Sequence, residues 1–194
     1  GHKPNADWRG HKADIYEGGH RVPFVVQWPG KVKPKSESDS TITTADFFNT
    51  VANIVGQTVD NNTAEDSFSF LADLLATGKT KRTTSIHHSI NGSFAIRKGP
   101  WKLILCPGSG GWSAPRPSKK AWGAERIVQL YNLETDPAEK HNVAEAHPER
   151  VSALVDQVAK EIKAGRSTEG EAVSNDGAIP FNATLLKKYP QLKN

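Results

Sequence analysis

The fold is decided by residues 84–105, which read TSIHHSINGSFAIRKGPWKLIL. Two turn signals, Asn91-Gly92 and Lys98-Gly99-Pro100, divide this stretch into three short runs rich in β-branched and apolar residues. Asn-Gly is a strong hairpin signal because the tight turn between two strands needs a positive φ. The pattern predicts three antiparallel strands, over residues 84–90, 94–97 and 101–105.

A further strand and a long helix are predicted downstream. Residues 128–133 have the composition of a strand, and a Gly/Ser/Pro-rich loop from Pro107 to about Ala124 separates them from the first three strands. Pro148 suits a first helical turn, and apolar residues then recur at helical spacing until Gly165: Val151, Leu154, Val155, Val158 and Ile162. We expect this helix to lie across a small antiparallel sheet.

The sequence upstream has a different pattern. Residues 22–28 form a short apolar run closed by Pro29-Gly30, which is typical of a buried strand in a sheet that is covered on both faces. Residues 43–55 predict an amphipathic helix that a threonine caps and Gly56 ends, and residues 68–75 predict a short helical segment.

Composition limits the class of protein. The 194 residues suffice for a real core, and five Trp and seven Phe argue against intrinsic disorder. The net charge of +4 is spread along the chain without a docking motif, so we expect no nucleic-acid partner. No apolar stretch approaches the roughly 20 residues that a membrane span needs. The chain opens with Gly1 and contains no methionine, so we expect a processed product or a piece of a longer protein.

Reactive side chains are densest at the beginning of the chain. A Gly-rich loop with cationic groups before a strand can hold an oxyanion, although a charged surface loop with ordinary ion pairs is the alternative. His87 and His88 lie in one predicted strand and should point to opposite faces, so that only one can face a given pocket and a structural role is equally possible. Cys106 has no assignable partner base and is expected to be a buried or incidental thiol.

Four blocks of the sequence, in order along about residues 10–160, resemble one family. The first reads KADIYEGGHRVPF over residues 12–24 and is followed by Trp28-Pro29-Gly30; the others are TADFFNT over 44–50, FAIRKGPWKLI over 94–104, and LYNL over 130–133 with DPAE over 136–139 and Asn142. These blocks resemble the sulfatases of the alkaline-phosphatase-like superfamily, with this chain as their carboxy-terminal portion.

The resemblance implies a fold and a division of the chain. The expected class is an alkaline-phosphatase-like α/β fragment, with the last strand and helix of a large α/β domain and a small α+β domain whose four-stranded antiparallel sheet packs on a long helix. We assign residues 1–80 to the end of the large domain, 81–165 to the small domain and 166–194 to a tail.

The resemblance also implies an activity, the hydrolysis of aryl or carbohydrate sulfate monoesters. Sulfatases use a formylglycine made within a C/S-x-P/A-x-R motif, beside a divalent cation that is usually calcium. No such motif occurs here, and Cys106-Pro107-Gly108-Ser109-Gly110 does not match it. The nucleophile and the metal ligands are therefore expected in an upstream sulfatase region, this chain is expected to supply no metal ligand, and the chain alone is expected to be inactive.

Four residues are carried over as candidates. Lys12 matches the sulfate-contacting lysine of the family, where a fixed ammonium would stabilise charge that develops on the ester oxygen. His87, His88 and Trp112 are expected to border the substrate, with Trp112 as a platform for a sugar or aryl ring. A phosphate or phosphonate monoester hydrolase on the same fold and a noncatalytic module that binds sulfated ligands remain alternatives. The expected partner is a sulfated small molecule or carbohydrate, and the expected location is periplasmic or extracellular.

Overall fold

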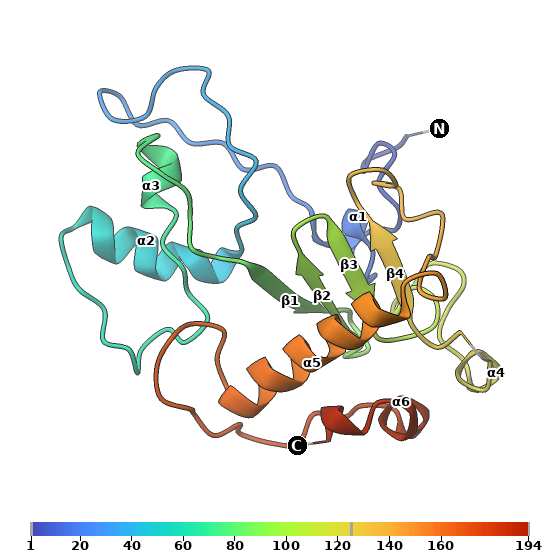
Figure 1. Ribbon diagram of the computed structural model, residues 1–194. Coiled ribbons are helices and arrows are strands. Elements are labelled where there is room, and N and C mark those ends of the chain that lie inside the picture. Colours follow the sequence, from blue (N-terminus) through green and yellow to red (C-terminus); the bar gives the residue numbers. More distant parts are fainter. Residues whose placement is uncertain (1, 125, 194) are drawn as a thin grey trace. The chain divides into compact units, whose positions relative to one another are not determined.

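The computed structural model describes residues 2–124 and 126–193, and it contains a four-stranded antiparallel sheet (Figure 1). The strands follow one another in the order β1-β2-β3-β4. Their bounds are β1 Thr84–His88, β2 Phe94–Lys98, β3 Trp101–Ile104 and β4 Gln129–Asn132. All four predicted strands are therefore confirmed, each within a few residues of its predicted ends.

The register of the sheet gives it two different faces. Ala95 pairs with Ile104 and Lys102 pairs with Tyr131, so these four side chains share one face, which also holds the buried cluster of Ile15 and Tyr16. The neighbouring residues of each strand, such as Leu103 and Leu130, point to the opposite face. The chain before α1 thus covers one side of the sheet.

Helix α5 (Pro148–Ala164) runs along the sheet in Figure 1. Its first turn contacts β3, because the Arg150 guanidinium lies 4.2 Å from the centre of the Trp101 ring and the His147 ring lies 5.2 Å from it. The helix buries the predicted apolar stripe: Val151, Leu154, Val155, Val158 and Ile162. Each such side chain contributes about 1.5–3 kcal/mol when fully buried, so the stripe fixes this helix.

The chain forms two compact units. The sheet unit comprises residues 1–22, 86–160 and 177–194, and the helical unit comprises 23–85 and 161–176. The passage at 85–86 lies near the predicted boundary at 81, whereas residues 1–22, which the sequence groups with the large domain, belong to the sheet unit. The division into a large and a small sulfatase domain remains a prediction.

The helical unit confirms the predicted helices and corrects the predicted strand. A 3-10 turn, η1 (Thr44–Asp46), leads into α2 (Phe47–Ile54), and α3 covers Leu71–Leu74. Residues 22–28, however, form no strand, and Val25 is 90% exposed. A strand needs a neighbour for its backbone N–H and C=O groups, and no described segment of this chain pairs with these residues. The apolar face of α2 is likewise exposed, with Val51 at 52% and the C-cap residue Val55 at 63%.

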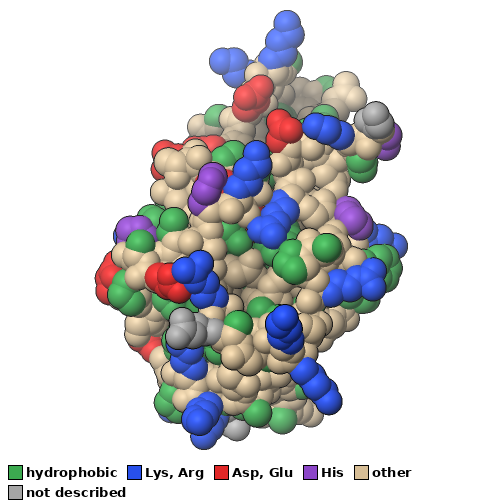
Figure 2. Space-filling view, turned by 90° about the vertical axis from the view of Figure 1, so that its right-hand side faces the viewer, with side chains coloured by type: hydrophobic (Ala, Val, Ile, Leu, Met, Phe, Trp, Pro, Cys, Tyr) green, Lys and Arg blue, Asp and Glu red, His purple; other side chains and the backbone are tan. Residues whose placement is uncertain are grey.

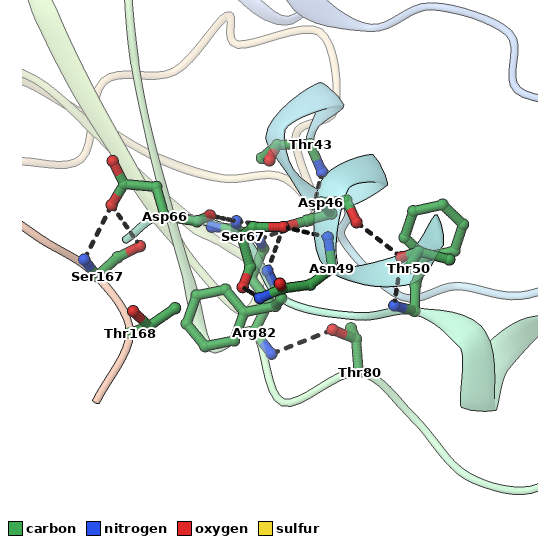
Figure 3. A network of polar contacts seen from close by, with 12 residues as sticks. Thr43, Asp46, Asn49, Thr50, Asp66, Ser67, Thr80, Arg82, Ser167 and Thr168 are labelled. Carbon is green, nitrogen blue, oxygen red and sulfur yellow. Dashed lines mark hydrogen bonds and ion pairs between the residues drawn. The ribbon is translucent and has the colours of Figure 1, made fainter. Parts of the chain in front are cut away.

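A buried ion pair organises the helical unit (Figure 3). The Arg82 guanidinium donates to both carboxylate oxygens of Asp46, from Nε at 2.9 Å and from Nη2 at 2.5 Å. The same guanidinium donates to the carbonyls of Asp66 at 2.6 Å and Thr84 at 2.9 Å. Asp46 also accepts from the backbone N–H of Thr43, at 2.8 Å, at the start of the helix. Arg82 therefore joins the beginning of α2 to two distant segments.

Replacing Arg82 with Lys is expected to lower the free energy of unfolding of the intact protein by about 2 kcal/mol, because an ammonium cannot form the planar bidentate pair and leaves carbonyls unpaired. Urea unfolding measures this effect. Lys81→Arg, at the exposed neighbouring position, is the control. Equal midpoints for Arg82→Lys and the parent would contradict the role given to the pair.

The tail contains structure that the sequence pattern did not indicate. Helix α6 (Ala183–Lys188) and the 3-10 turn η2 (Pro190–Leu192) bury Leu185 and Leu192, and Asn182 caps α6 through the Thr184 N–H. Two further four-residue helices, α1 (Glu17–His20) and α4 (Lys119–Trp122), lie within predicted loops. None of the helices described has the length and apolar character needed to cross a bilayer.

Candidate functional site

Three loops of the sheet unit meet at the segment that carries Lys12. We call residues 11–15, 89–93 and 108–116 the three-loop platform. The Ile90 N–H donates to the Ala13 carbonyl at 3.0 Å, and the Ile15 N–H donates to the Ser109 carbonyl at 2.7 Å. Ala13 itself has a φ of +87°, an uncommon conformation for a residue with a side chain. The Lys12 loop is thus held by backbone bonds on both sides.

The Asp14 carboxylate fastens two of these loops to each other. It is fully buried and accepts from the backbone N–H groups of His11 at 2.9 Å, Trp112 at 2.8 Å and Ser113 at 3.0 Å, and from the Ser113 hydroxyl. Burial acts to raise the pKa of Asp14, but the hydrogen bonds from Ser113, His11 and Trp112 hold it below its usual range. Asp14 lies two residues after Lys12 in the sequence. Its charged carboxylate therefore fastens the loop that carries Trp112 to the loop that carries Lys12.

Gly111 is required by the same contact. A Cβ atom there would lie 2.4 Å from the Ala13 carbonyl oxygen and 2.6 Å from Asp14 Oδ1, which is closer than real Cβ contacts. Glycine permits this approach because it has no side chain. The close packing explains why the Ser-Gly-Gly-Trp stretch of the loop, which the sequence shows only as Gly-rich, takes a defined course.

Two of the four candidate residues, Lys12 and Trp112, lie in the platform, and His88 directly precedes its second loop. Lys12 is exposed, and within residues 2–124 and 126–193 it has no ion pair. Trp112 is 53% exposed. His88 is exposed at the end of β1, where its Nδ1 lies 3.1 Å from the Ser89 carbonyl and the chain enters the second loop. A free ammonium and an aromatic surface are therefore available to a ligand at the platform, whereas the His88 ring lies 6.1 Å from the Phe94 ring.

His87 points the other way, as the alternation of the strand predicts. Its ring lies 4.2 Å from the ring of His20, and the Nε2 atoms of both are buried without a hydrogen-bond partner. Burial, and then the charge of Lys102, hold the pKa of His87 well below its ordinary value, and the same causes lower that of His20 to about 4. Of the two alternatives open for His87, this packing favours a structural histidine.

This histidine pair predicts how stability changes with pH. Both imidazoles resist protonation when folded, whereas in the unfolded chain they protonate with an ordinary pKa of 6.5. Their contribution is therefore present above pH 6.5 and is lost as the pH falls toward 4. We expect the free energy of unfolding to fall between pH 7 and pH 5, and to fall less in His20→Gln. His141→Gln, at an exposed position, should keep the parent's slope; an unchanged slope in His20→Gln would contradict this account.

A buried cluster of charges lies beside the platform, and sequence reasoning missed it. Lys102 is fully buried on β3, and its Nζ lies 3.0 Å from Glu17 Oε1 and 3.0 Å from Glu139 Oε1. The second of these is an ion pair without hydrogen-bond alignment. Glu139 Oε2 also accepts from the Glu17 N–H at 2.6 Å, and Glu17 Oε2 accepts from Arg21 Nε at 2.9 Å.

The pKa values of Glu17 and Glu139 shift in opposite directions because different numbers of cations surround the two carboxylates. Burial acts to raise the pKa of Glu17, but Lys102, Arg21 and Arg97 together lower it to about 2. Among the described residues the Glu139 carboxylate forms an ion pair with Lys102 alone, so burial dominates and raises the pKa of Glu139. The cluster joins the first, third and fourth sequence blocks, which are far apart in the chain. The one available signal was that Lys102 occupies a strand position two residues before Ile104, which faces the core.

No catalytic nucleophile or cation site is evident in the part of the chain that the structure describes. No group of three or more His, Cys, Asp or Glu side chains is arranged there to hold a metal ion. Cys106 is buried, and burial raises the pKa of its thiol to about 11, so it is not a thiolate at neutral pH. The residues present therefore do not fit the calcium site that the family resemblance implies.

Comparisons with known proteins agree with this geometry. The chain is 38% identical over 157 residues to an N-acetylgalactosamine-6-O-sulfatase of Bacteroides thetaiotaomicron, which covers 79% of this chain and 30% of that protein. It is 30% identical over 157 residues to human arylsulfatase A, over 74% of this chain and 31% of that protein. No protein-family model matches the sequence.

A solved structure from work on the metabolism of multiple glycosaminoglycans by Bacteroides thetaiotaomicron has the same fold. Its TM-score is 0.70 at 36% identity, and the match covers 82% of this chain and 33% of that one. The shared blocks, the four-stranded sheet with its helices and these relatives point to one family. The chain belongs to the sulfatases, on the alkaline-phosphatase-like α/β fold, and spans about 30% of the length of the curated relatives that it matches.

Proposed function

We propose that this chain is the carboxy-terminal portion of a sulfatase that hydrolyses sulfate monoesters of carbohydrates or aryl compounds, and that Lys12 contacts the sulfate. The observation that carries the proposal is the free ammonium of Lys12 on a loop held in place by Ile90, Ser109 and the buried Asp14. The related Bacteroides thetaiotaomicron protein is named an N-acetylgalactosamine-6-O-sulfatase, and this name supports a sulfated sugar as the substrate.

The residues of this chain would act by position and charge. As the ester bond breaks, negative charge builds on the ester oxygen, and a fixed ammonium at Lys12 stabilises that charge without first giving up its proton. The fixed loop matters because a donor placed before the reaction needs no reorganisation during it. Trp112 and His88 would border the sugar or aryl group. His87 packs against His20 and would act by holding β1 in place.

The remaining parts of the reaction would come from the rest of the polypeptide. The family uses a formylglycine nucleophile and calcium, and neither a C/S-x-P/A-x-R motif nor a cation site is found among the residues that the structure describes. We therefore propose that the chain by itself is inactive and needs an upstream sulfatase region. We also propose a periplasmic or extracellular location, because members of this family are often exported.

The test is the release of inorganic sulfate from 4-nitrophenyl sulfate and from N-acetylgalactosamine 6-sulfate by the intact polypeptide that contains this chain. Release from either supports the proposal. Binding of the sugar without release would favour the noncatalytic module. Hydrolysis of 4-nitrophenyl phosphate, but of neither sulfate ester, would favour a phosphate monoester hydrolase of the same fold. The isolated chain, tested in parallel, is expected to release none.

A further inference from the structure

A basic surface adjoins the platform on its Trp112 side. Residues 107–124 contain Arg116, Lys119 and Lys120 but no acidic residue. All three cations are exposed, and none has an ion pair within the described residues. Figure 2 looks onto the side of Figure 1 on which α4 lies, and Lys and Arg side chains are spread over this face, whereas Asp and Glu side chains are confined to its top and one side. No acidic side chain among the described residues pairs with the three cations of this segment.

The cations are held in defined places beside the indole. Arg116 Nε donates to the Trp112 carbonyl at 2.7 Å, which ties the guanidinium to the backbone of the residue that carries the exposed ring. The loop between them is fixed by the bonds from Ser109 N to the Pro115 carbonyl at 2.8 Å and from Ser109 Oγ to the Ser113 carbonyl at 2.7 Å. A loop with its internal polar groups satisfied loses little conformational entropy when a ligand binds.

Helix α4 carries the two lysines and is anchored by its last residue. Trp122 packs against the buried cluster of Tyr16, Cys106 and Tyr131, and Ser118 caps the first turn by accepting from the Ala121 N–H at 3.1 Å. Lys119 and Lys120 are therefore presented to solvent from an element that the core holds in place. Residues 107–124 thus present three exposed cations and one exposed aromatic ring.

We propose that Trp112, Arg116, Lys119 and Lys120 form a subsite for a second anionic group of an acidic oligosaccharide whose scissile sulfate lies at Lys12. This inference rests on the proposed function and narrows its substrate class. The apolar face of a sugar ring can lie against the indole, while the planar fork of Arg116 matches a carboxylate or a sulfate. Two exposed lysines add attraction that depends on salt and lowers KM more than it raises kcat.

Three matched ligands and two matched variants test the subsite in the intact protein. The ligands are N-acetylgalactosamine 6-sulfate, the disaccharide in which a hexuronic acid is joined to it, and the methyl ester of that disaccharide. The variants are Lys119→Ala with Lys120→Ala, and Lys160→Ala with Lys163→Ala, which removes the same charge from exposed positions of α5.

We expect the parent protein to bind the uronic disaccharide roughly three- to tenfold more tightly than its methyl ester at low salt, the scale of a few exposed charge contacts. The Lys119/Lys120 variant should lose most of this preference, with the change in KM and not in kcat, and the Lys160/Lys163 variant should keep it. Equal preference in both variants would overturn the subsite, as would a preference that persists at 1 M salt. Arg116→Lys should weaken the preference less than Arg116→Ala.

The design separates this inference from the proposed function. Titration calorimetry with the same disaccharides reports binding whether or not sulfate is released. Turnover of 4-nitrophenyl sulfate without a charge preference would leave the sulfatase proposal standing and remove the subsite. A sulfated disaccharide that carries a second sulfate in place of the carboxylate shows which anion is preferred, and equal binding of all the disaccharides would count against the subsite alone.

Discussion

Replacing Lys12 with Ala in the intact protein is expected to lower kcat for an aryl sulfate by about 10²–10³, the scale for removing one preorganised electrostatic contact to a developing charge. The side chain is exposed and bonded to nothing in the described chain, so its loss should not alter folding. The expected change lies in kcat more than in KM, because charge on the ester oxygen is greatest in the transition state.

The control for this experiment is Lys3→Ala, which removes an exposed lysine from the same N-terminal segment. It should leave kcat within about twofold of the parent value, which is the change expected for loss of an exposed surface charge. Lys12→Arg keeps the charge but changes its geometry, and should retain part of the rate. A Lys12→Ala enzyme with the parent's kcat would remove Lys12 from the sulfate pocket, whatever the family assignment.

Replacing Lys102 with Met is expected to lower the free energy of unfolding by about 3–5 kcal/mol, because removing one member of a buried ion pair leaves an uncompensated charge. Glu17 keeps Arg21 at 2.9 Å and Arg97 at 3.7 Å, so Glu139 carries most of the loss. Denaturant unfolding of the intact protein at pH 7 measures this cost. The same change should displace the α1 segment, which follows the Lys12 loop.

A double-mutant cycle distinguishes the ion cluster from simple loss of packing. Lys102→Met combined with Glu139→Gln removes both the cation and the charge that it leaves behind, and should recover a substantial part of the lost stability. Lys98→Met, at the exposed end of β2, is the matched control and should change stability by less than about 0.5 kcal/mol. A double variant no more stable than Lys102→Met would show that the charge of Glu139 is not the cause.

The sheet and α5 were predictable because each is a local pattern. Turn residues at Asn91-Gly92 and Gly99 set the strand ends, and the 3.6-residue spacing from Val151 to Ile162 set the helix face. The strand over residues 22–28 was predicted from its apolar composition, yet composition does not supply a pairing partner, and within the described chain there is none. The wrong prediction thus concerns a contact and not a residue preference.

The candidate site was predictable only as single residues. The family blocks identified Lys12, and the alternation of β1 placed His87 and His88 on opposite faces. The bonds that assemble the site were not visible in the sequence, because Asp14 meets Ser113 and Glu17 meets Glu139 across separations of 99 and 122 residues. No local pattern reports contacts at such range. The sequence likewise does not show that Arg116 donates a hydrogen bond to the Trp112 carbonyl four residues before it.

The most direct test of the central claim is the ratio of kcat/KM for 4-nitrophenyl sulfate to that for 4-nitrophenyl phosphate, measured with the intact polypeptide that contains this chain. The two esters share a leaving group, so the ratio reports which tetrahedral anion the site stabilises in the transition state. A sulfatase should favour the sulfate ester by at least about 10², corresponding to roughly 2.7 kcal/mol of transition-state stabilisation. A preference for the phosphate ester would contradict the proposed function and assign the fold to phosphate monoester hydrolysis.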